Sequence, residues 1–272
     1  TLRKHVKRSQ SFCHKNQLEG ESFMAKTDLL KTGIELLDRL LGGGINPGSL
    51  CIVVGEPLGG KELIALEFFC EGLRLGEGGI YVTMVNFAEE VESAIASRGL
   101  DLSAYRGANP KYRIIDLYRP TVDFSVEDSD TVTYVPAPTD LAALSSKIVD
   151  AAMKLSHLSR VRIIIDSLSS IISFASPKSA LRFMSFMKAK VQLSSNVILA
   201  TLEQKLANDV ETESILHLAN TLIFLEKNRL EIRRRGKTPV EVTVKFSNEK
   251  IIEANPPKKT QKNQNSKKPS EH

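Results

Sequence analysis

The chain has 272 residues, of which 42% are hydrophobic and 25% are charged. This length supports one substantial hydrophobic core, and the near-average composition argues against a collagen-like, fully disordered or repeat-array protein. The three cysteines, Cys13, Cys51 and Cys70, are odd in number and widely spaced, which argues against a disulfide framework or a zinc site. No apolar run approaches the roughly 20 residues of a membrane helix, and no signal-peptide stretch is present, so we expect a cytoplasmic protein without membrane contact.

The net charge of +5 is unevenly distributed along the chain. Residues 1–26 hold six basic and two acidic side chains, and residues 255–272 hold five lysines and one glutamate, so the segment between them carries −3. We expect a basic, flexible N-terminal segment (1–26), a folded domain (27–254) and a disordered basic tail (255–272). Because Met24 precedes the first regular segment, residues 1–23 could be an extension outside the folded domain. The tails could attract nucleic acid or an acidic partner, or serve only solubility.

From residue 50 onward, short β-rich apolar runs alternate with amphipathic helical patterns. This alternation predicts an α/β fold with a largely parallel sheet flanked by helices. Strands are predicted at residues 50–54, 79–84, 113–116, 161–166, 197–201 and 221–225. Helices are predicted at residues 61–75 and 140–158, and a third begins at Pro177 and buries Leu181, Met184, Met187 and Val191.

Two further segments differ from this alternation. After residue 225 the apolar pattern has a period of two, which predicts an antiparallel C-terminal extension of the sheet. Residues 117–138 are acidic and rich in turn-forming residues, which predicts a long loop. Loops of this length are often functional or mobile, and an inert insertion is equally consistent with the sequence.

The most informative segment joins a predicted strand to a predicted helix. It consists of Gly55, Glu56, Pro57, Leu58, Gly59, Gly60, Lys61 and Glu62. All positions except the last fit the phosphate-binding pattern G-x-x-x-x-G-K-[S/T], in which backbone N–H groups cradle a phosphate and the lysine reaches the outer phosphates. We therefore expect a site for ATP or ADP.

The last position of the pattern is Glu62, where a hydroxyl would ligate Mg²⁺. A carboxylate can also ligate Mg²⁺, but it brings negative charge next to the β- and γ-phosphates. Two outcomes follow: a nucleotide site with altered metal binding, or a vestigial site. Asp166 ends a predicted strand, where an acidic residue can face the metal opposite a phosphate loop. Asp166 and Glu62 are therefore the candidate metal ligands.

A family resemblance is carried by a block that precedes the loop and runs into it. The block contains Thr32-Gly33, Leu37-Asp38, the run LGGGI at residues 41–45, and Gly48. With the phosphate loop and the Asp166 strand, residues 27–254 resemble the KaiC-like branch of the RecA superfamily of P-loop ATPases. The resemblance implies a RecA-type core, ATP and Mg²⁺ at the strand ends, and a homo-oligomer, commonly a ring or filament with nucleotide between subunits.

The chain also departs from the family pattern. Active relatives usually carry a catalytic glutamate after the second strand, where this chain has Val85 and Asn86. Glu89 and Glu90 follow only later, in an expected helix. Without a placed base, activation of the attacking water is lost, which costs about 10²–10⁴-fold in rate.

Arg233 and Arg235 fall on one face of a predicted strand because side chains alternate. They are similar to the basic-x-Arg-Gly segment that family members extend to the nucleotide of a neighbouring subunit, where cations stabilise phosphate charge. A solvated basic strand end explains the pattern equally well.

The preferred hypothesis is a KaiC-like protein that binds ATP or ADP at a degenerate P-loop, hydrolyses it weakly or not at all, and acts as a regulatory or assembly component. One alternative is a DNA-repair accessory similar to RadA paralogs, although four acidic residues within the predicted loop 203–213 disfavour DNA in a central pore. A second alternative is an active ATPase in which Glu62 ligates the metal and changes its metal preference.

Overall fold

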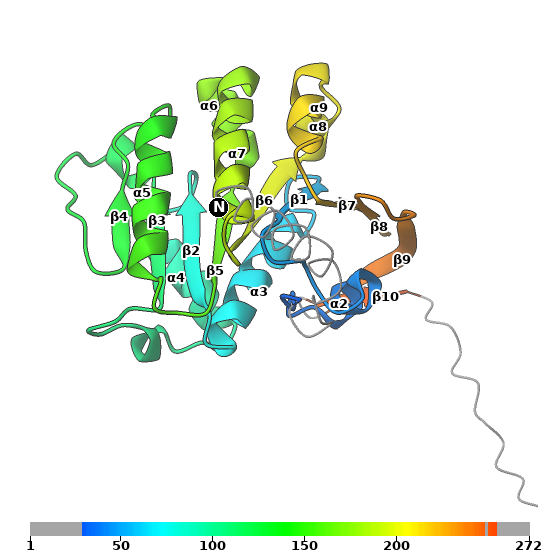
Figure 1. Ribbon diagram of the computed structural model, residues 1–272, viewed down its shortest axis with the longest axis horizontal. Helices are drawn as coiled ribbons and strands as arrows, with labels where there is room; N and C mark the ends of the chain where they lie inside the picture. The colour runs from blue at the N-terminus through cyan, green and yellow to red at the C-terminus, as the bar shows by residue number, and fades with distance from the viewer. Residues whose placement is uncertain (1–28, 248–249, 255–272) are drawn as a thin grey trace, which may run out of the picture.

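Figure 1 shows the computed structural model of the protein, which describes residues 29–247 and 250–254. These residues form a ten-stranded sheet in the order β10-β9-β8-β7-β1-β6-β5-β2-β3-β4, with helices on both faces. The predicted basic segments 1–26 and 255–272 lie outside the described residues, as do Cys13 and Met24. Within the described ranges, no helix combines the length and the apolar character needed to cross a membrane.

Seven strands are parallel, and all of them except the edge strand β4 coincide with predicted strands. They are β1 (Leu50–Gly55), β2 (Gly78–Thr83), β3 (Tyr112–Asp116), β4 (Val132–Tyr134), β5 (Val161–Asp166), β6 (Val197–Glu203) and β7 (Thr221–Glu226). β1 pairs with β6 and β7, and β2 pairs with β3 and β5, all in parallel. Helices cover these strands on both faces, which explains why they are continuous apolar runs in the sequence. The predicted α/β fold class is confirmed.

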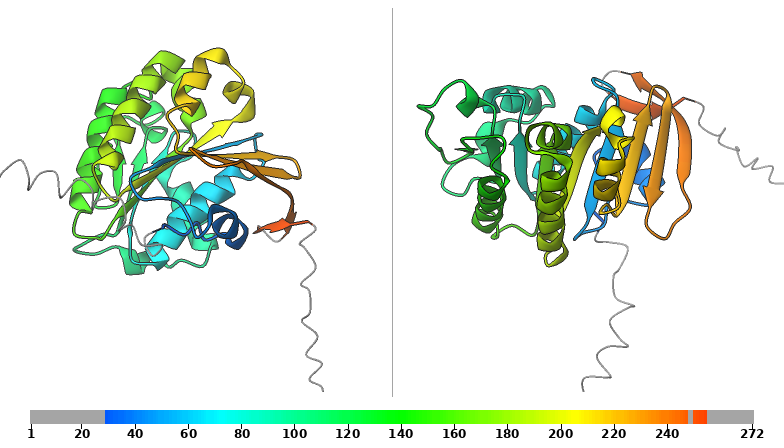
Figure 2. Two further views of the ribbon diagram at one scale, coloured as in Figure 1. Left: turned by 45° about the vertical axis from the view of Figure 1, so that its right-hand side comes forward. Right: turned by 90° about the horizontal axis from the view of Figure 1, so that it is seen from above.

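The antiparallel extension predicted after residue 225 is also confirmed. It consists of β8 (Arg229–Arg234), β9 (Val240–Ser247) and β10 (Lys250–Glu253). Figure 2 shows these strands curving away from the parallel part of the sheet toward α2 (Glu35–Leu41). Glu253 of β10 forms an ion pair with Arg39 of α2, which joins the end of the extension to the start of the domain.

Two layers of helices create two hydrophobic cores, one on each face of the sheet (Figure 2). α2, α3 (Lys61–Arg74) and α4 (Ala88–Ser97) cover one face, and α5 (Leu141–Lys154), α6 (Leu168–Ala175), α7 (Pro177–Gln192) and α9 (Val210–Leu216) cover the other. Alternate residues of β1 divide between the cores: Cys51 and Val53 face the first, and Ile52 and Val54 face the second. The short helices α8 (Gln204–Ala207), η1 (Leu102–Tyr105) and η2 (Arg119–Thr121) complete the fold.

Some predicted boundaries are wrong. Residues 117–138 are not only a loop, because they contain η2 and the edge strand β4, whose three residues are too few to show an alternating pattern. Residues 203–213, predicted as a loop, end β6 and form α8 and the first half of α9. The helix expected over 140–158 ends at Lys154. In α7, Leu181 is only half-buried, and Phe183 takes a buried position that the pattern did not single out.

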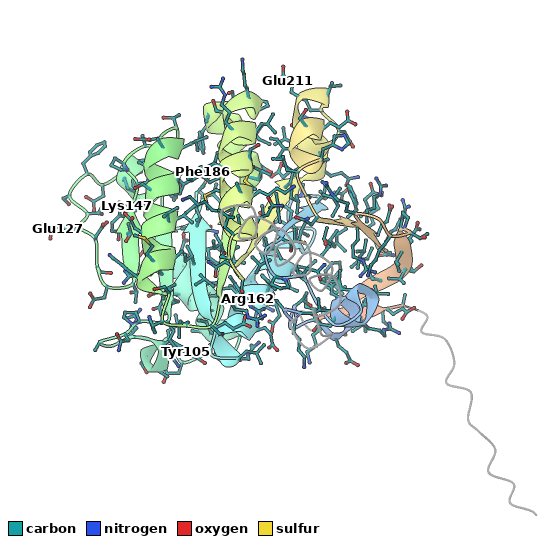
Figure 3. All side chains as sticks on the ribbon, in the orientation of Figure 1. Tyr105, Glu127, Lys147, Arg162, Phe186 and Glu211 are labelled. Carbon is teal, nitrogen blue, oxygen red and sulfur yellow. The ribbon has the colours of Figure 1, made fainter. Side chains whose placement is uncertain are left out.

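A buried ion pair connects the strand that carries Asp166 to the first helical layer. The guanidinium of Arg162 in β5 is fully buried, and its Nε donates to Oε2 of Glu77 at 2.5 Å. Its Nη1 donates to the backbone carbonyls of Lys31 (2.6 Å) and Phe68 (2.9 Å). Figure 3 shows Arg162 at the lower end of the sheet, opposite the end at which β5 terminates in Asp166. Arg162 therefore fixes β5, α3 and the chain at Lys31 relative to one another.

Candidate functional site

The glycine-rich loop lies between β1 and α3, as predicted. β1 ends at Gly55, and α3 begins at Lys61, with Gly60 in a left-handed conformation (φ 95°) at the cap position. No side chain caps the first turn of α3, so its backbone N–H groups lack a side-chain partner. Free N–H groups and the partial positive charge of a helix N-terminus are the elements that bind a phosphate.

The glycines of this loop are required by close contacts. A β-carbon on Gly59 would lie 2.9 Å from the backbone oxygen of Glu56, and one on Gly60 would lie 2.5 Å from the ring of Phe246. Phe246 belongs to β9, so the antiparallel extension forms one wall of the loop. This wall could not be predicted from the sequence, because the contact depends on the way the extension curves.

Lys61 does not project into open space. It is 2% exposed, and its Nζ donates to Oε1 of Glu62 at 2.5 Å and to the backbone oxygen of Glu56 at 3.1 Å. The lysine that would reach the outer phosphates is therefore bound to its own loop. The carboxylate of Glu62 occupies the place of the metal-ligating hydroxyl and neutralises the charge of Lys61.

Asp166 lies at the end of β5 and is 7% exposed. Its Oδ1 accepts a hydrogen bond from the Thr201 hydroxyl and its Oδ2 accepts one from the Tyr81 hydroxyl, both at 2.7 Å. Burial raises the pKa of Asp166, while these two hydrogen bonds oppose the rise. Burial, followed by the charge of Asp166, raises the pKa of Tyr81, which keeps its phenol a hydrogen-bond donor.

Tyr81 and Thr201 are site residues that the sequence did not reveal. Tyr81 belongs to β2 and Thr201 to β6, the two strands that flank β5 in the sheet. Neither residue stands near Asp166 along the chain, and both look like ordinary strand residues. Only the strand order could have identified them.

The two candidate metal ligands come from different elements but share one environment. After burial and the hydrogen bonds, the negative charge of Glu62 is a further cause that raises the pKa of Asp166. In the described part of the chain, no cluster of three or more histidine, cysteine, aspartate or glutamate side chains could hold a metal. Mg²⁺ needs only one or two carboxylates when phosphate oxygens and water complete its shell. Asp166 and Glu62 thus fit a metal that arrives with a nucleotide.

The position of the missing glutamate is occupied by Val85 and Asn86, both exposed after the end of β2. The backbone oxygen of Asn86 accepts a hydrogen bond from the Thr83 hydroxyl at 2.8 Å, which fixes the turn. The side chain of Val85 cannot accept a proton, and the amide of Asn86 is not a base. This arrangement therefore has no general base at the usual place.

The nearby acidic residues do not replace that base. Glu89 forms an ion pair with Arg119 at 2.7 Å, and Glu90 caps α4 by accepting the backbone N–H of Phe87 at 2.7 Å. Both residues belong to the first turn of α4, as expected from the sequence. Their carboxylates are occupied by structural contacts.

The arginine side chains at the end of β8 alternate between the two faces of the sheet, as predicted. The guanidinium of Arg233 stacks on Phe224 at 4.6 Å, and Arg235 donates to the backbone oxygen of His217, next to α9, at 3.0 Å. Arg234 points the opposite way and donates to the backbone of α2. Arg233 and Arg235 therefore share one side of the sheet, and their approach to a neighbouring subunit stays a prediction.

One cavity adjoins the loop, and a second cavity lies next to the first. The first has a volume of about 690 Å³ and is lined by loop residues together with Arg98, Lys227 and Phe246. The second, of about 980 Å³, lies among α2, α3 and β10, and Leu63 and Arg98 line both. The first cavity has the size of a small-molecule site and begins directly at the phosphate loop.

The chain matches known proteins along most of its described length. The family model described as "ATPase: KaiC" matches residues 30–242. A UPF0273 protein of Pyrococcus horikoshii is 26% identical over 145 residues, which are 53% of this chain and 56% of that protein. The circadian clock protein KaiC3 of Synechocystis is 28% identical over 153 residues, which are 56% of this chain and 28% of KaiC3.

A solved structure supports the same fold. A KaiC-like protein of Pyrococcus horikoshii has a TM-score of 0.62 at 18% identity, and the match covers 84% of this chain and 99% of that chain. The chain spans just over half the length of the first UPF0273 relatives that it matches. Because the family model covers well over half of the sequence, the chain belongs to the KaiC family of RecA-type P-loop ATPases.

Proposed function

We propose that this protein binds ATP or ADP at a degenerate P-loop in which Glu62 is a built-in counter-ion for Lys61. We further propose that it hydrolyses the nucleotide weakly or not at all and acts as a regulatory or assembly component. The observation that carries the proposal is the Lys61–Glu62 ion pair within the loop, at 2.5 Å.

This ion pair opposes nucleotide binding in two ways. A phosphate must first replace the Glu62 carboxylate at the Lys61 ammonium, which costs the energy of that contact. The carboxylate then lies close to the phosphates and repels them. Because the repulsion grows with phosphate charge, ATP without a metal should bind no more tightly than ADP. The site would therefore respond to the metal as well as to the nucleotide.

A bound Mg²⁺ would neutralise part of the phosphate charge at this site. Asp166 and Glu62 are the residues that would hold it. Tyr81 and Thr201 keep the Asp166 carboxylate oriented by their hydrogen bonds. Lys61 and the N–H groups of the first turn of α3 would then bind phosphate oxygens, and the Phe246 ring would limit access of water from one side.

Two features support weak or absent hydrolysis. No base stands where relatives place the catalytic glutamate, since Val85 and Asn86 occupy that turn. Glu89 and Glu90 are engaged with Arg119 and with the α4 N-terminus. Binding without turnover suits a protein that changes partners or assembly state with the nucleotide it holds.

Calorimetric titration of ATP and ADP, with and without Mg²⁺, tests the proposal. The wild type should bind weakly, Lys61→Ala should not bind, and Glu62→Thr should bind MgATP at least about tenfold more tightly, because one opposing charge is removed. Glu35→Gln, an exposed change in α2 with the same loss of charge, should bind as the wild type does. If neither the wild type nor Glu62→Thr binds any nucleotide, the site is vestigial and the proposal fails.

The Glu62→Thr variant also distinguishes the proposal from the alternative of an active ATPase. Its supporting observation is that Glu62 and Asp166 interact electrostatically and could share one metal. If Glu62 ligates that metal, Glu62→Thr should leave activity unchanged or lower, and Mn²⁺ should be preferred to Mg²⁺. Steady-state turnover that Lys61→Ala abolishes would contradict the proposed inactivity.

We extend the proposal to a homo-oligomer in which Arg233 and Arg235 approach a neighbour's nucleotide. What supports it is the shared face of the two side chains: Arg235 has no carboxylate partner among the described residues, whereas Arg233 is paired with Glu231. Sedimentation velocity with and without nucleotide should show assembly that Arg235→Ala weakens and that Lys237→Ala, a nearby exposed change, leaves intact. An assembly state that changes neither with nucleotide nor with Arg235→Ala would contradict the proposed role of these arginines.

A further inference from the structure

The outer face of α7 carries an unusual distribution of charge. The helix runs from Pro177 to Gln192 and contains four basic residues but no aspartate or glutamate. Its buried face, which includes Phe183, Met184 and Met187, packs on the sheet. Lys178, Arg182, Phe186 and Lys190 form the opposite, exposed face, which we name the α7 stripe.

Successive residues of the α7 stripe are four positions apart, so each lies next to the following one on the helix surface, and the row turns by about 40° around the helix axis at each step. This spacing corresponds to about 6 Å per step and about 18 Å from the first to the last residue. Phe186 is 45% exposed, and the ammonium of Lys190 lies 5.4 Å from the centre of its ring. The stripe is thus a regular row of cations with one aromatic side chain in the row.

The cations of the stripe are not neutralised within the described chain. Lys178, Arg182 and Lys190 form no hydrogen bond or ion pair with any residue that the structure describes. Arg39, Arg74, Arg106, Arg119 and Arg229, by contrast, all have carboxylate partners within 4 Å. Uncompensated like charges repel one another, so this row is costly unless it meets negative charge.

The surroundings limit where that negative charge can come from. Figure 3 shows Phe186 in the middle of α7, between α5 with Lys147 and α9 with Glu211. The acidic residues of α9 would repel an acidic ligand on that side, and α5 on the other side exposes Asp150 as well as Lys154, which lies beside Asp128. A ligand should therefore lie along α7 itself, where the cations have no partner among the described residues.

We propose that the α7 stripe is a docking site for an acidic amphipathic helix of a partner protein. A helix repeats every four residues at the same 6 Å step as the stripe, so its carboxylates can meet Lys178, Arg182 and Lys190 in register. The partner would carry the pattern acidic-x3-acidic-x3-apolar-x3-acidic, or its reverse, with the apolar residue against Phe186. A single-stranded nucleic acid would use several stacking aromatics, and the stripe offers one.

The docking site is independent of the nucleotide site, because α7 contributes no residue to the phosphate loop. Binding is expected to be electrostatically steered and to weaken with salt. The apolar position then fixes the register, since only one placement of the partner brings its apolar side chain to Phe186.

The test uses the full chain and a fluorescent synthetic peptide of about 20 residues, long enough to be helical, that carries this pattern. A second peptide has the same composition with the acidic residues moved out of register. Anisotropy should show that the wild type prefers the registered peptide, that Arg182→Glu with Lys190→Glu weakens it about tenfold or more, and that Phe186→Ala weakens it about threefold. Lys154→Glu with Lys237→Glu, the matched charge control, and Lys61→Ala should each change it less than twofold.

Three outcomes would overturn the proposal. Equal affinity for the two peptides would mean that charge alone, including that of the basic tails, causes the binding. Equal affinity of the wild type and the Arg182→Glu, Lys190→Glu variant would place the binding elsewhere. Tighter binding of a thymidine oligonucleotide, lost in the same variant, would identify the stripe as a nucleic-acid surface instead.

Discussion

Lys61 of the phosphate loop is held by the residue that follows it, with Nζ of Lys61 2.5 Å from Oε1 of Glu62. In the pattern that this loop otherwise follows, the lysine binds phosphate and the next residue binds the metal. Here the two residues bind each other. A single substitution has therefore changed both the charge of the site and the partner of its main cation.

Asp166→Asn should stabilise the protein at neutral pH. Burial raises the pKa of Asp166 above its ordinary value, so the native state holds this proton more tightly than the unfolded chain does. The ionised carboxylate therefore lowers stability at neutral pH, and its cost disappears as the pH falls below the raised native pKa. Asparagine carries no charge, so the melting temperature of the variant should exceed that of the wild type at pH 7.

The pH dependence is the control for this prediction. The difference in melting temperature between Asp166→Asn and the wild type should shrink as the pH is lowered from 7 and the wild-type carboxyl takes up its proton. A difference that grows toward low pH would show that the hydrogen bonds from Tyr81 and Thr201 outweigh burial.

Glu77→Ala should be among the most destabilising single changes outside the apolar core. It leaves the buried guanidinium of Arg162 without its carboxylate, and breaking such pairs costs about 3–5 kcal/mol. Urea unfolding measures the loss. Glu241→Ala, which breaks an exposed pair with Arg229, should cost less than about 1 kcal/mol. Similar values for both variants would mean that Arg162 finds other partners.

Gly60→Ala should abolish nucleotide binding and lower stability. The added methyl group would lie 2.5 Å from the Phe246 ring, and alanine is strained at the left-handed φ of 95°. Adding Phe246→Ala should recover the part of the loss caused by the clash. A cost of about 1–2 kcal/mol, caused by the backbone conformation, should persist. Full recovery in the double variant would show that backbone strain contributes nothing.

Restoring a base should restore turnover only in a site that binds nucleotide well. In the Glu62→Thr background, Val85→Glu or Asn86→Glu should raise the rate of ATP hydrolysis by about 10²-fold over Glu62→Thr alone. A phosphate-release assay measures this, and Asn86→Gln, which adds length without a base, is the control. No gain in either variant would indicate that a further part of the catalytic machinery is missing.

Cys51 and Cys70 should resist alkylation in the native protein. Burial raises the pKa of each thiol to about 12, so almost no reactive thiolate exists at pH 8. Peptide mapping after iodoacetamide treatment should find both unmodified in buffer and both modified in urea. Because mapping separates the cysteines, Cys13 does not interfere. Modification of Cys70 by iodoacetamide in the folded protein would show that α3 opens.

The elements that are determined by residues adjacent in the chain could be predicted from the sequence. The apolar run of β1, the glycines of the loop and the helical pattern of α3 follow one another directly, so each predicts the next. The antiparallel strands were predictable because a period of two survives where one face of a strand is polar. β4 was not predictable, because three half-buried residues show no period.

The contacts that decide the chemistry depend on strand order instead. Tyr81 and Thr201 reach Asp166 because β2 and β6 flank β5, and Phe246 reaches Gly60 because β9 curves over the loop. No local pattern marks these residues. The Lys61–Glu62 contact is the exception: the two residues are adjacent, and the departure of Glu62 from the loop pattern was visible in the sequence.

The two edges of the sheet are protected from pairing with other chains by different means. An open strand edge can add a strand from a second molecule, which leads to aggregation. At one edge, β4 offers only three residues. At the other, β10 curves toward α2 and is held there by the ion pair of Glu253 with Arg39. Loosening α2 would therefore expose the β10 edge of the sheet before the core opens. This short helix thus helps to prevent aggregation through that edge.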